Sequence, residues 1–190
     1  MQKVWAQKQT GFTIVELLIV IVVIGILAAI TIVAYNGVQQ RATNTSRIAA
    51  AKHTQNILRA YKTTYDNYPS TGARCLTVDN ACANYNGTAL TSDNSAILTE
   101  LRKLGTPIDS VSKSGSFYGI YYDYYAPRTF NGDKIPVLMM YWLEGDNQQC
   151  QLPNVAMGLP ATPDEPNRFG TSTTGYTGTG GGRTSCWVSI

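Results

Sequence analysis

Apolar residues are concentrated in one block near the N-terminus of this 190-residue chain. From Phe12 to Ala34 the sequence reads FTIVELLIVIVVIGILAAITIVA, and Glu16 is the only charged residue in it. As a helix this block would extend roughly 35 Å, enough to cross a hydrocarbon layer about 30 Å thick with some tilt. An ordinary secretory signal has a shorter apolar core of roughly 7–15 residues, so we expect the block to remain in the mature protein as a membrane-spanning helix.

The helical pattern continues after the apolar block but becomes one-sided. Apolar and aromatic residues recur at spacings of three, four and seven until Pro69, which ends the pattern. The sequence therefore predicts one long helix from Phe12 to about Asp66, apolar over 12–34 and amphipathic over 35–68. The residues of the amphipathic stripe are Ile48, Ala51, Leu58, Tyr61, Tyr65 and Tyr68.

Residues 69–190 predict a mixed head with loops, one short helix and several strands. The short helix is expected from a cap at Ser92 or Asp93 to Leu104, with Gly105 as its stop. Pro160 to Arg183 is rich in Pro, Thr and Gly and predicts a long exposed loop. The predicted strands are Phe117 to Ala126, Ile135 to Leu143 and Cys186 to Ile190, the first two joined by a turn within Arg128 to Lys134.

These elements predict an α+β fold, in which the long N-terminal helix packs on a small antiparallel β-sheet head. The tyrosines at 118, 121, 122, 124 and 125 fall on both faces of the first strand, so we expect some of their rings to be exposed. Packing across strands explains such a cluster; an adhesive surface is the alternative.

Four cysteines next to an export-type N-terminus indicate two disulfides and an oxidising compartment. Three pairings are possible. We favour Cys75–Cys82 and Cys150–Cys186, because each closes a local loop. A metal site is disfavoured, since the chain has no C-x-x-C motif and His53 is its single histidine.

The sequence carries no signature of an enzyme. It lacks G-x-S-x-G, a Walker loop and H-E-x-x-H, and we expect neither catalysis nor a cofactor. Asp164 and Glu165 do not have the spacing of a calcium loop. A formal net charge of +3 does not by itself indicate nucleic-acid binding, which usually requires a clustered basic face.

Glu16 is the unusual residue of the apolar block, because a carboxylate inside a membrane helix is costly and generally functional. It stands in the run GFTIVELLIV, Gly11 to Val20, which IGILAAI follows at 24–30. Lys3 and Lys8 precede it and should stay cytoplasmic by the positive-inside rule. These residues closely resemble the prepilin signature of type IV pilins and pseudopilins. The resemblance is strong from Lys8 to Tyr35 and much weaker beyond.

The resemblance implies a processing route and an assembly role. A prepilin peptidase would cut between Gly11 and Phe12, removing residues 1–11 as a leader, and would N-methylate Phe12. Glu16 would pair with the N-terminal amine of a neighbouring subunit, and a carboxylate buried in a helix bundle does need such a cation. The implied partners are further copies of the chain, the peptidase, the membrane, and an assembly platform in the cytoplasmic membrane. A proline that many members carry near the end of the apolar run is absent here.

Three functions remain, of which the first is our prediction. It is a structural subunit of an extracellular type IV pilus for adhesion, surface motility or DNA uptake. Such a subunit is held in the cytoplasmic membrane, with its head, 69–190, outside, until it enters the filament. The alternative is a pseudopilin of a type II secretion or competence system. The third is a membrane-anchored binding domain. Two predicted disulfides, the long C-terminal loop and a sizeable head favour the pilus.

Overall fold

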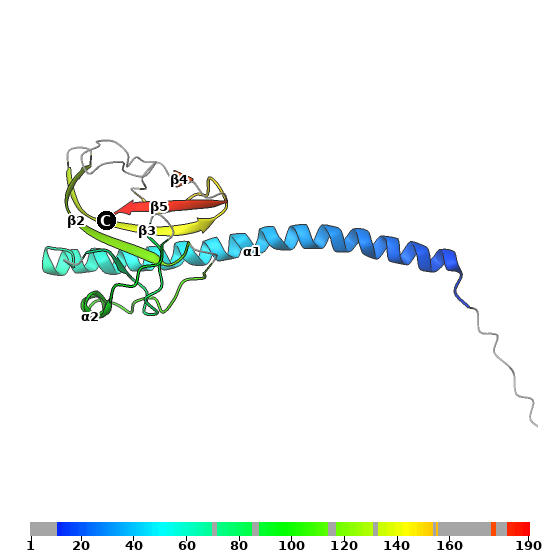
Figure 1. Cartoon of the computed structure of the whole chain (residues 1–190), viewed down its shortest axis with the longest axis horizontal. Helices are drawn as coiled ribbons and strands as arrows, with labels where there is room; N and C mark the ends of the chain where they lie inside the picture. The colour runs from blue at the N-terminus through cyan, green and yellow to red at the C-terminus, as the bar shows by residue number, and fades with distance from the viewer. Residues whose placement is uncertain are drawn as a thin grey trace, which may run out of the picture. The chain divides into compact units, whose positions relative to one another are not determined.

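The computed structural model describes residues 11–69, 72–84, 88–113, 117–130, 133–153, 155, 176–177 and 182–190. The chain forms two compact units, one ending at Gln39 and the other running from Gln40 to Ile190. Helix α1, Ile14–Tyr65, contributes to both (Figure 1). No proline occurs within it, and it ends where Asp66 takes a left-handed conformation at φ 53°.

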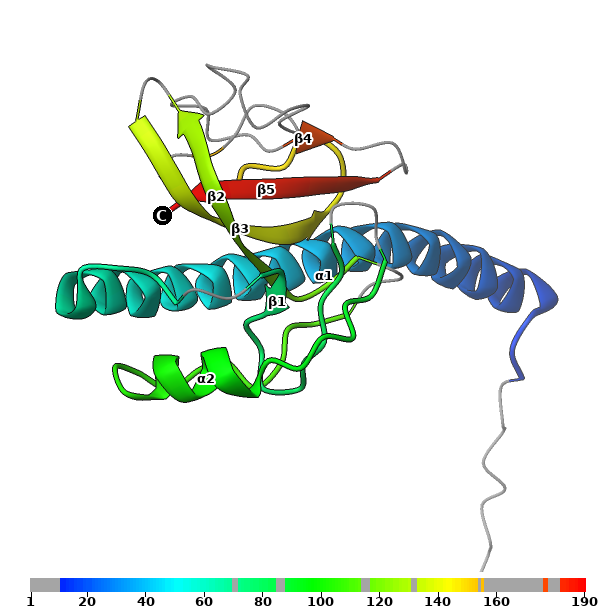
Figure 2. The ribbon, with the colours of Figure 1, turned by 60° about the vertical axis from the view of Figure 1, so that its left-hand side comes forward.

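The second unit contains a mixed α+β head, which confirms the predicted fold class. Its five-stranded antiparallel sheet has the order β1-β2-β3-β5-β4, and α2, Ser95–Arg102, lies outside the sheet. Strands β2 and β3 form the long central hairpin, and β5 returns beside β3 (Figures 1 and 2). The strands are β1 Arg74–Cys75, β2 Ile120–Phe130, β3 Asp133–Glu144, β4 Tyr176–Thr177 and β5 Arg183–Ser189.

Both faces of the sheet are covered by apolar side chains. On one face Ala51 and Leu58 of α1 belong to a buried cluster with Tyr122 and Tyr141 of the sheet. On the other face a separate cluster surrounds Trp142, and its members come from the sheet and from the loop that contains β1. These members are Cys75, Cys82, Tyr121, Leu138, Met140, Trp142 and Trp187.

Polar side chains of α1 also fix the helix to the end of β3. Asn44 pairs with the backbone of Glu144 in both directions: its Oδ1 accepts from the Glu144 N–H and its Nδ2 donates to the Glu144 carbonyl, both at 2.8 Å. Gln40 Nε2 donates to the same carbonyl at 2.7 Å. Arg47, only 1% exposed, donates to the Ser112 carbonyl at 2.7 Å and forms an ion pair with Glu144 at 3.3 Å. Burial lowers the pKa of the Arg47 guanidinium, and Glu144 opposes that shift.

Two disulfides lie in the head. Cys75 is bonded to Cys82, with 5.5 Å between the Cα atoms, and this bond lies in the cluster on the outer face of the sheet. Cys150 is bonded to Cys186 of β5, with 5.7 Å between the Cα atoms. No free cysteine remains, because these two bonds use all four cysteines of the chain.

The predicted strands have the wrong boundaries. β2 begins later than expected, at Ile120, and continues past Pro127 to Phe130. Its register with β3 shifts between Tyr124 and Arg128, so three residues of β2 face the single residue Pro136. A proline cannot donate to the ladder but fits at such an irregularity, which is why the strand does not end there.

The predicted turn within Arg128 to Lys134 is therefore too long, because the hairpin pairs Phe130 with Asp133. The final strand begins three residues early, at Arg183. β1 was not predicted, and β4 lies inside the segment predicted as a loop. Most of that loop, and the leader up to residue 10, lie outside the described residues.

Two helix predictions also need correction. α2 is shorter than expected, because it begins at Ser95 and ends at Arg102. Asp93 lies before the helix and accepts a hydrogen bond from the Ser95 N–H at 3.0 Å. The stripe on α1 is partly wrong, because the Tyr65 side chain is 45% exposed while Ile57 is buried. None of the tyrosines that were expected to expose some rings is fully exposed among those described: Tyr121 and Tyr122 are buried because each face of the sheet has its own cover, and Tyr118 and Tyr124 are half-buried. The side chain of Tyr125 is not among those described.

Candidate processing and assembly site

The first described residues form an accessible segment ahead of α1. Gly11 and Phe12 are not part of the helix, and a side chain added at Gly11 would meet no atom within 4 Å. Phe12 is 84% exposed. Proteases cut preferentially in exposed segments without regular secondary structure, and the predicted cleavage bond lies between these two residues.

Thr13 and Glu16 form a capping box at the start of α1. The carboxylate oxygen Oε2 of Glu16 accepts from the Thr13 N–H at 2.8 Å and from the Thr13 hydroxyl at 2.7 Å. In return the Glu16 N–H donates to the Thr13 hydroxyl at 3.3 Å. This arrangement is the T-x-x-E motif that begins helices. Among the described residues, the second oxygen of Glu16, Oε1, accepts no hydrogen bond and is available to a further donor.

The apolar residues that follow Glu16 are exposed along the entire first part of α1. Every large apolar side chain described there, from Phe12 to Ile32, is between 48 and 84% exposed. By length and composition α1 is the one helix among the described residues that could cross a membrane. A soluble monomer rarely exposes a contiguous apolar surface of this extent, so another apolar phase must cover it.

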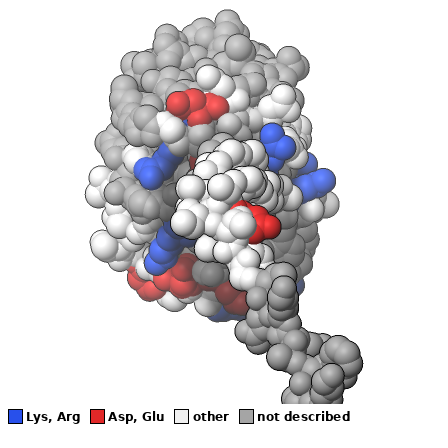
Figure 3. All heavy atoms as spheres, turned by 90° about the vertical axis from the view of Figure 1, so that its right-hand side faces the viewer, with Lys and Arg blue, Asp and Glu red and all other residues white. Residues whose placement is uncertain are grey.

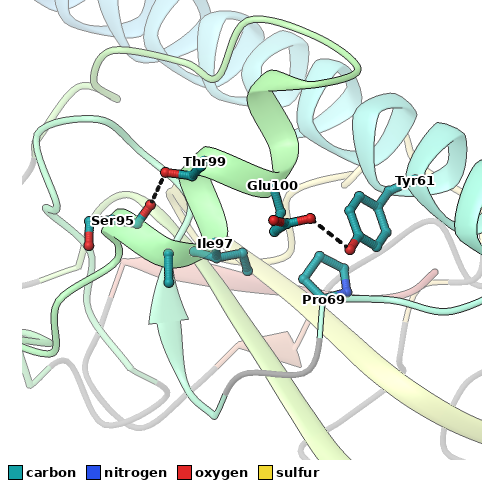
Figure 4. A pocket seen from close by; sticks show the side chains of 7 residues that line it. Tyr61, Pro69, Ser95, Ile97, Thr99 and Glu100 are labelled. Carbon is teal, nitrogen blue, oxygen red and sulfur yellow. Dashed lines mark hydrogen bonds between the residues drawn. The ribbon is translucent and has the colours of Figure 1, made fainter.

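A hollow of the head lies between the C-terminal part of α1 and α2. It measures about 390 Å³, and Tyr61, Pro69 and Glu100 contribute to its walls (Figure 4). The Tyr61 hydroxyl donates to Glu100 Oε2 at 3.1 Å, and Lys103 pairs with the same carboxylate at 2.7 Å. Burial raises the pKa of the Tyr61 phenol, with Glu100 adding to the shift, whereas Lys103 and Tyr61 lower that of Glu100. These groups satisfy one another and include no nucleophile beside a base.

The head offers no constellation for a metal within the described residues, where no three His, Cys, Asp or Glu side chains come together. His53 Nε2 lies 2.8 Å from the Thr106 carbonyl oxygen, which occupies that ring nitrogen. On the face that Figure 3 shows, charges of both signs are scattered and do not form one basic patch. Asp164 and Glu165 lie outside the described residues.

Comparison with known families identifies the N-terminal segment. Residues 6–32 match the model of the prokaryotic N-terminal methylation motif. The chain is type IV pilin-like. This match confirms the resemblance and includes Gly11, Phe12 and Glu16, whose individual roles stay predictions.

Curated relatives of this pilin-like chain belong to type II secretion. It is 34% identical over 85 residues to the type II secretion system core protein G of Escherichia coli strain K12, covering 42% of this chain and 59% of that protein. The core proteins G of Aeromonas hydrophila and Vibrio cholerae are also 34% identical, each over 65 residues, covering 46% and 44% of their lengths. The chain thus spans about half the length of the curated relatives it matches. No solved structure matches at comparable significance.

Proposed function

We propose that the protein is a pseudopilin, a processed subunit of a filament that serves a type II secretion-like system. The chain is inserted with residues 1–11 in the cytoplasm, cut after Gly11 and N-methylated on Phe12. The apolar half-helix, 12–34, then holds it in the cytoplasmic membrane until an assembly platform transfers it to the filament. One observation carries the proposal: an exposed apolar helix that bears a single carboxylate at its start.

The proposal explains what shields the apolar half-helix from water before and after assembly. Before assembly lipid covers it, and after assembly the same helix of neighbouring copies does. Burying it against other helices requires a cation for Glu16. Cleavage supplies one, because it creates an amine on Phe12 of each new subunit, and Oε1 of Glu16 accepts nothing else among the described residues. Similarity to core proteins of type II secretion favours the pseudopilin over the extracellular pilus that the sequence alone predicted.

A pilus subunit remains the second candidate because of the Cys150–Cys186 bond. It closes a segment of 36 residues at the end of the head, a feature that resembles the disulfide-bounded region of many pilins. The two candidates differ in the phenotype of a strain that lacks the protein. If the protein is a pseudopilin, a strain that lacks it should retain exported substrates in the periplasm and keep its surface filaments. If the protein is a pilus subunit, a strain that lacks it should lose its surface filaments and continue to secrete.

Glu16→Ala tests the shared part of both candidates. The variant should insert and be cleaved, since removing a charge favours insertion, but it should fail to polymerise when it is the only copy. Thr31→Ala is the matched control, because it also removes a polar group from the exposed apolar helix, one that donates only to the Ala28 carbonyl. Normal polymer from Glu16→Ala would show that Glu16 is a tolerated charge.

A further inference from the structure

The head contains a second, larger hollow that none of the proposed steps uses. It measures about 640 Å³ and lies between α1 and the loop that follows β3. We name it the amide groove, because side-chain amides dominate its lining. Its defining residues are Arg41, Asn44 and Thr45 of α1 and Asn147, Gln148 and Gln151 of the loop.

The wall that the loop forms is held in a fixed conformation. Asn147 and Gln151 have positive φ values of 54° and 58°, and a left-handed conformation is costly for glutamine. The Gln148 N–H donates to the Thr184 hydroxyl of β5 at 2.9 Å, and Cys150 is bonded to Cys186. A loop tied to β5 at two points in this way offers a preorganised surface, which binds at a lower entropic cost than a free loop.

Arg41 gives the groove its charge. It is the only ionisable residue in the lining, its side chain is exposed, and no described residue forms an ion pair with it. A guanidinium among neutral amides offers several donors, which suit carboxylates and backbone carbonyls. The groove therefore fits an acidic loop of a protein.

The same chain carries such a loop elsewhere on its head. The backbones at 77–79 and 108–109 run side by side, with the Val78 N–H donating to the Ile108 carbonyl and the Asp79 N–H to the Asp109 carbonyl, both at 2.9 Å. This pairing brings the exposed Asp79 and Asp109 to one edge, which we name the acidic edge. Neither carboxylate has an ion-pair partner within the described part of the chain.

The two surfaces lie on different sides of the head. In both ribbon views β3, β5 and the described start of the loop after β3 lie above α1, whereas α2 lies below (Figures 1 and 2). Two complementary patches on separate sides of one subunit make a heterologous contact, which generates a ring if its rotation closes and an open helical filament if it does not. A symmetric dimer would instead need one self-complementary patch.

We propose that the amide groove of one subunit receives the acidic edge of the next subunit in the filament. Arg41 faces Asp79 and Asp109 across this contact and sets the register of the heads. This inference rests on the proposed function, because it names the head contact of the same polymer. Opposite charges at a contact chiefly select the correct partner and orientation, while apolar packing of the half-helices supplies most of the affinity.

Charge reversal in the full-length chain, expressed as the only copy, tests the contact. Arg41→Glu should lower the assembled fraction roughly tenfold, because it places like charges face to face. The paired variant Asp79→Lys with Asp109→Lys should do the same, and combining all three changes should restore assembly. Lys52→Glu is the matched control, an equal charge change at an exposed position of α1 outside the groove, and it should assemble normally.

A cross-link provides an independent readout. Arg41→Cys combined with Asp109→Cys should give a disulfide ladder of dimers and higher oligomers in the assembled fraction, and none when Glu16→Ala blocks polymerisation. Normal assembly of Arg41→Glu, lack of recovery in the combined variant, or absence of the ladder would each overturn the contact. Failure of the proposed function is distinguishable, since then the unmodified chain itself would remain uncleaved or unpolymerised.

Discussion

Asn44→Ala should destabilise the head, because it removes the side chain that joins α1 to the end of β3. Asn44 is buried, and its Oδ1 is the acceptor for the Glu144 N–H. The Glu144 carbonyl keeps its hydrogen bond from Gln40, so the loss is concentrated on one backbone donor. An unmet buried donor costs about 1–3 kcal/mol, and we expect the free energy of unfolding to fall by about 2 kcal/mol.

Urea titration of the full chain in detergent micelles measures this loss. The fluorescence of the buried Trp142 and Trp187 reports unfolding of the head. With a slope of about 2 kcal/mol per molar urea, the midpoint should drop by roughly 1 M. Thr45→Ala is the control, since this exposed neighbour donates only to the Arg41 carbonyl of its own helix, and its midpoint should hardly move. Equal midpoints for the two variants would refute the role of Asn44.

Three further predictions concern the stability of the head. Gly119→Ala should cost at least about 2 kcal/mol in the same titration, because φ is 79° and the new Cβ would lie 2.2 Å from the Ala81 carbonyl oxygen, whereas Gly37→Ala, with open space around it, should be neutral or slightly stabilising. Non-reducing peptide mapping should recover Cys75 with Cys82 and Cys150 with Cys186; replacing the second pair by alanine should cost about 4 kcal/mol and the first about 2 kcal/mol, because the closed loops span 36 and 7 residues. Burial raises the pKa of the Tyr122 and Tyr141 phenols, which donate to the Pro69 and Cys150 carbonyls. In the unfolded chain these tyrosines lose their protons near pH 10, whereas in the folded chain they keep them. The free energy of unfolding should therefore be unaffected below about pH 10 and fall above it, and it should fall less steeply in Tyr122→Phe.

The sequence predicts the features that depend on local pattern. The long helix is predictable because an uninterrupted apolar run begins it and a proline at 69 ends it. The motif around Glu16 is predictable because one charge stands inside that run. The hairpin is also predictable in kind, because its two runs are rich in β-branched and aromatic residues.

Features that depend on tertiary pairing are not predictable in this way. Arg47 and Asn44 look like surface residues of a helix, yet both are buried because the end of β3 offers them backbone partners, the carbonyls of Trp142 and Glu144. β1 has only two residues, and its pairing with Tyr121 and Tyr122 leaves no periodic signal. The amide groove combines residues about 100 positions apart in the chain, and the sequence does not reveal the left-handed conformations of Asn147 and Gln151 in its wall.

The intact mass of the mature protein tests the central claim most directly. Protein recovered from membranes and from assembled filaments should have the mass of a chain that begins at Phe12 and carries one methyl group on its N-terminal nitrogen. Gly11→Val should block cleavage and leave residues 1–11, with Lys3 and Lys8, attached. A mature chain that still begins at Met1, or one that begins beyond Ala29 and has therefore lost the apolar half-helix, would contradict the account.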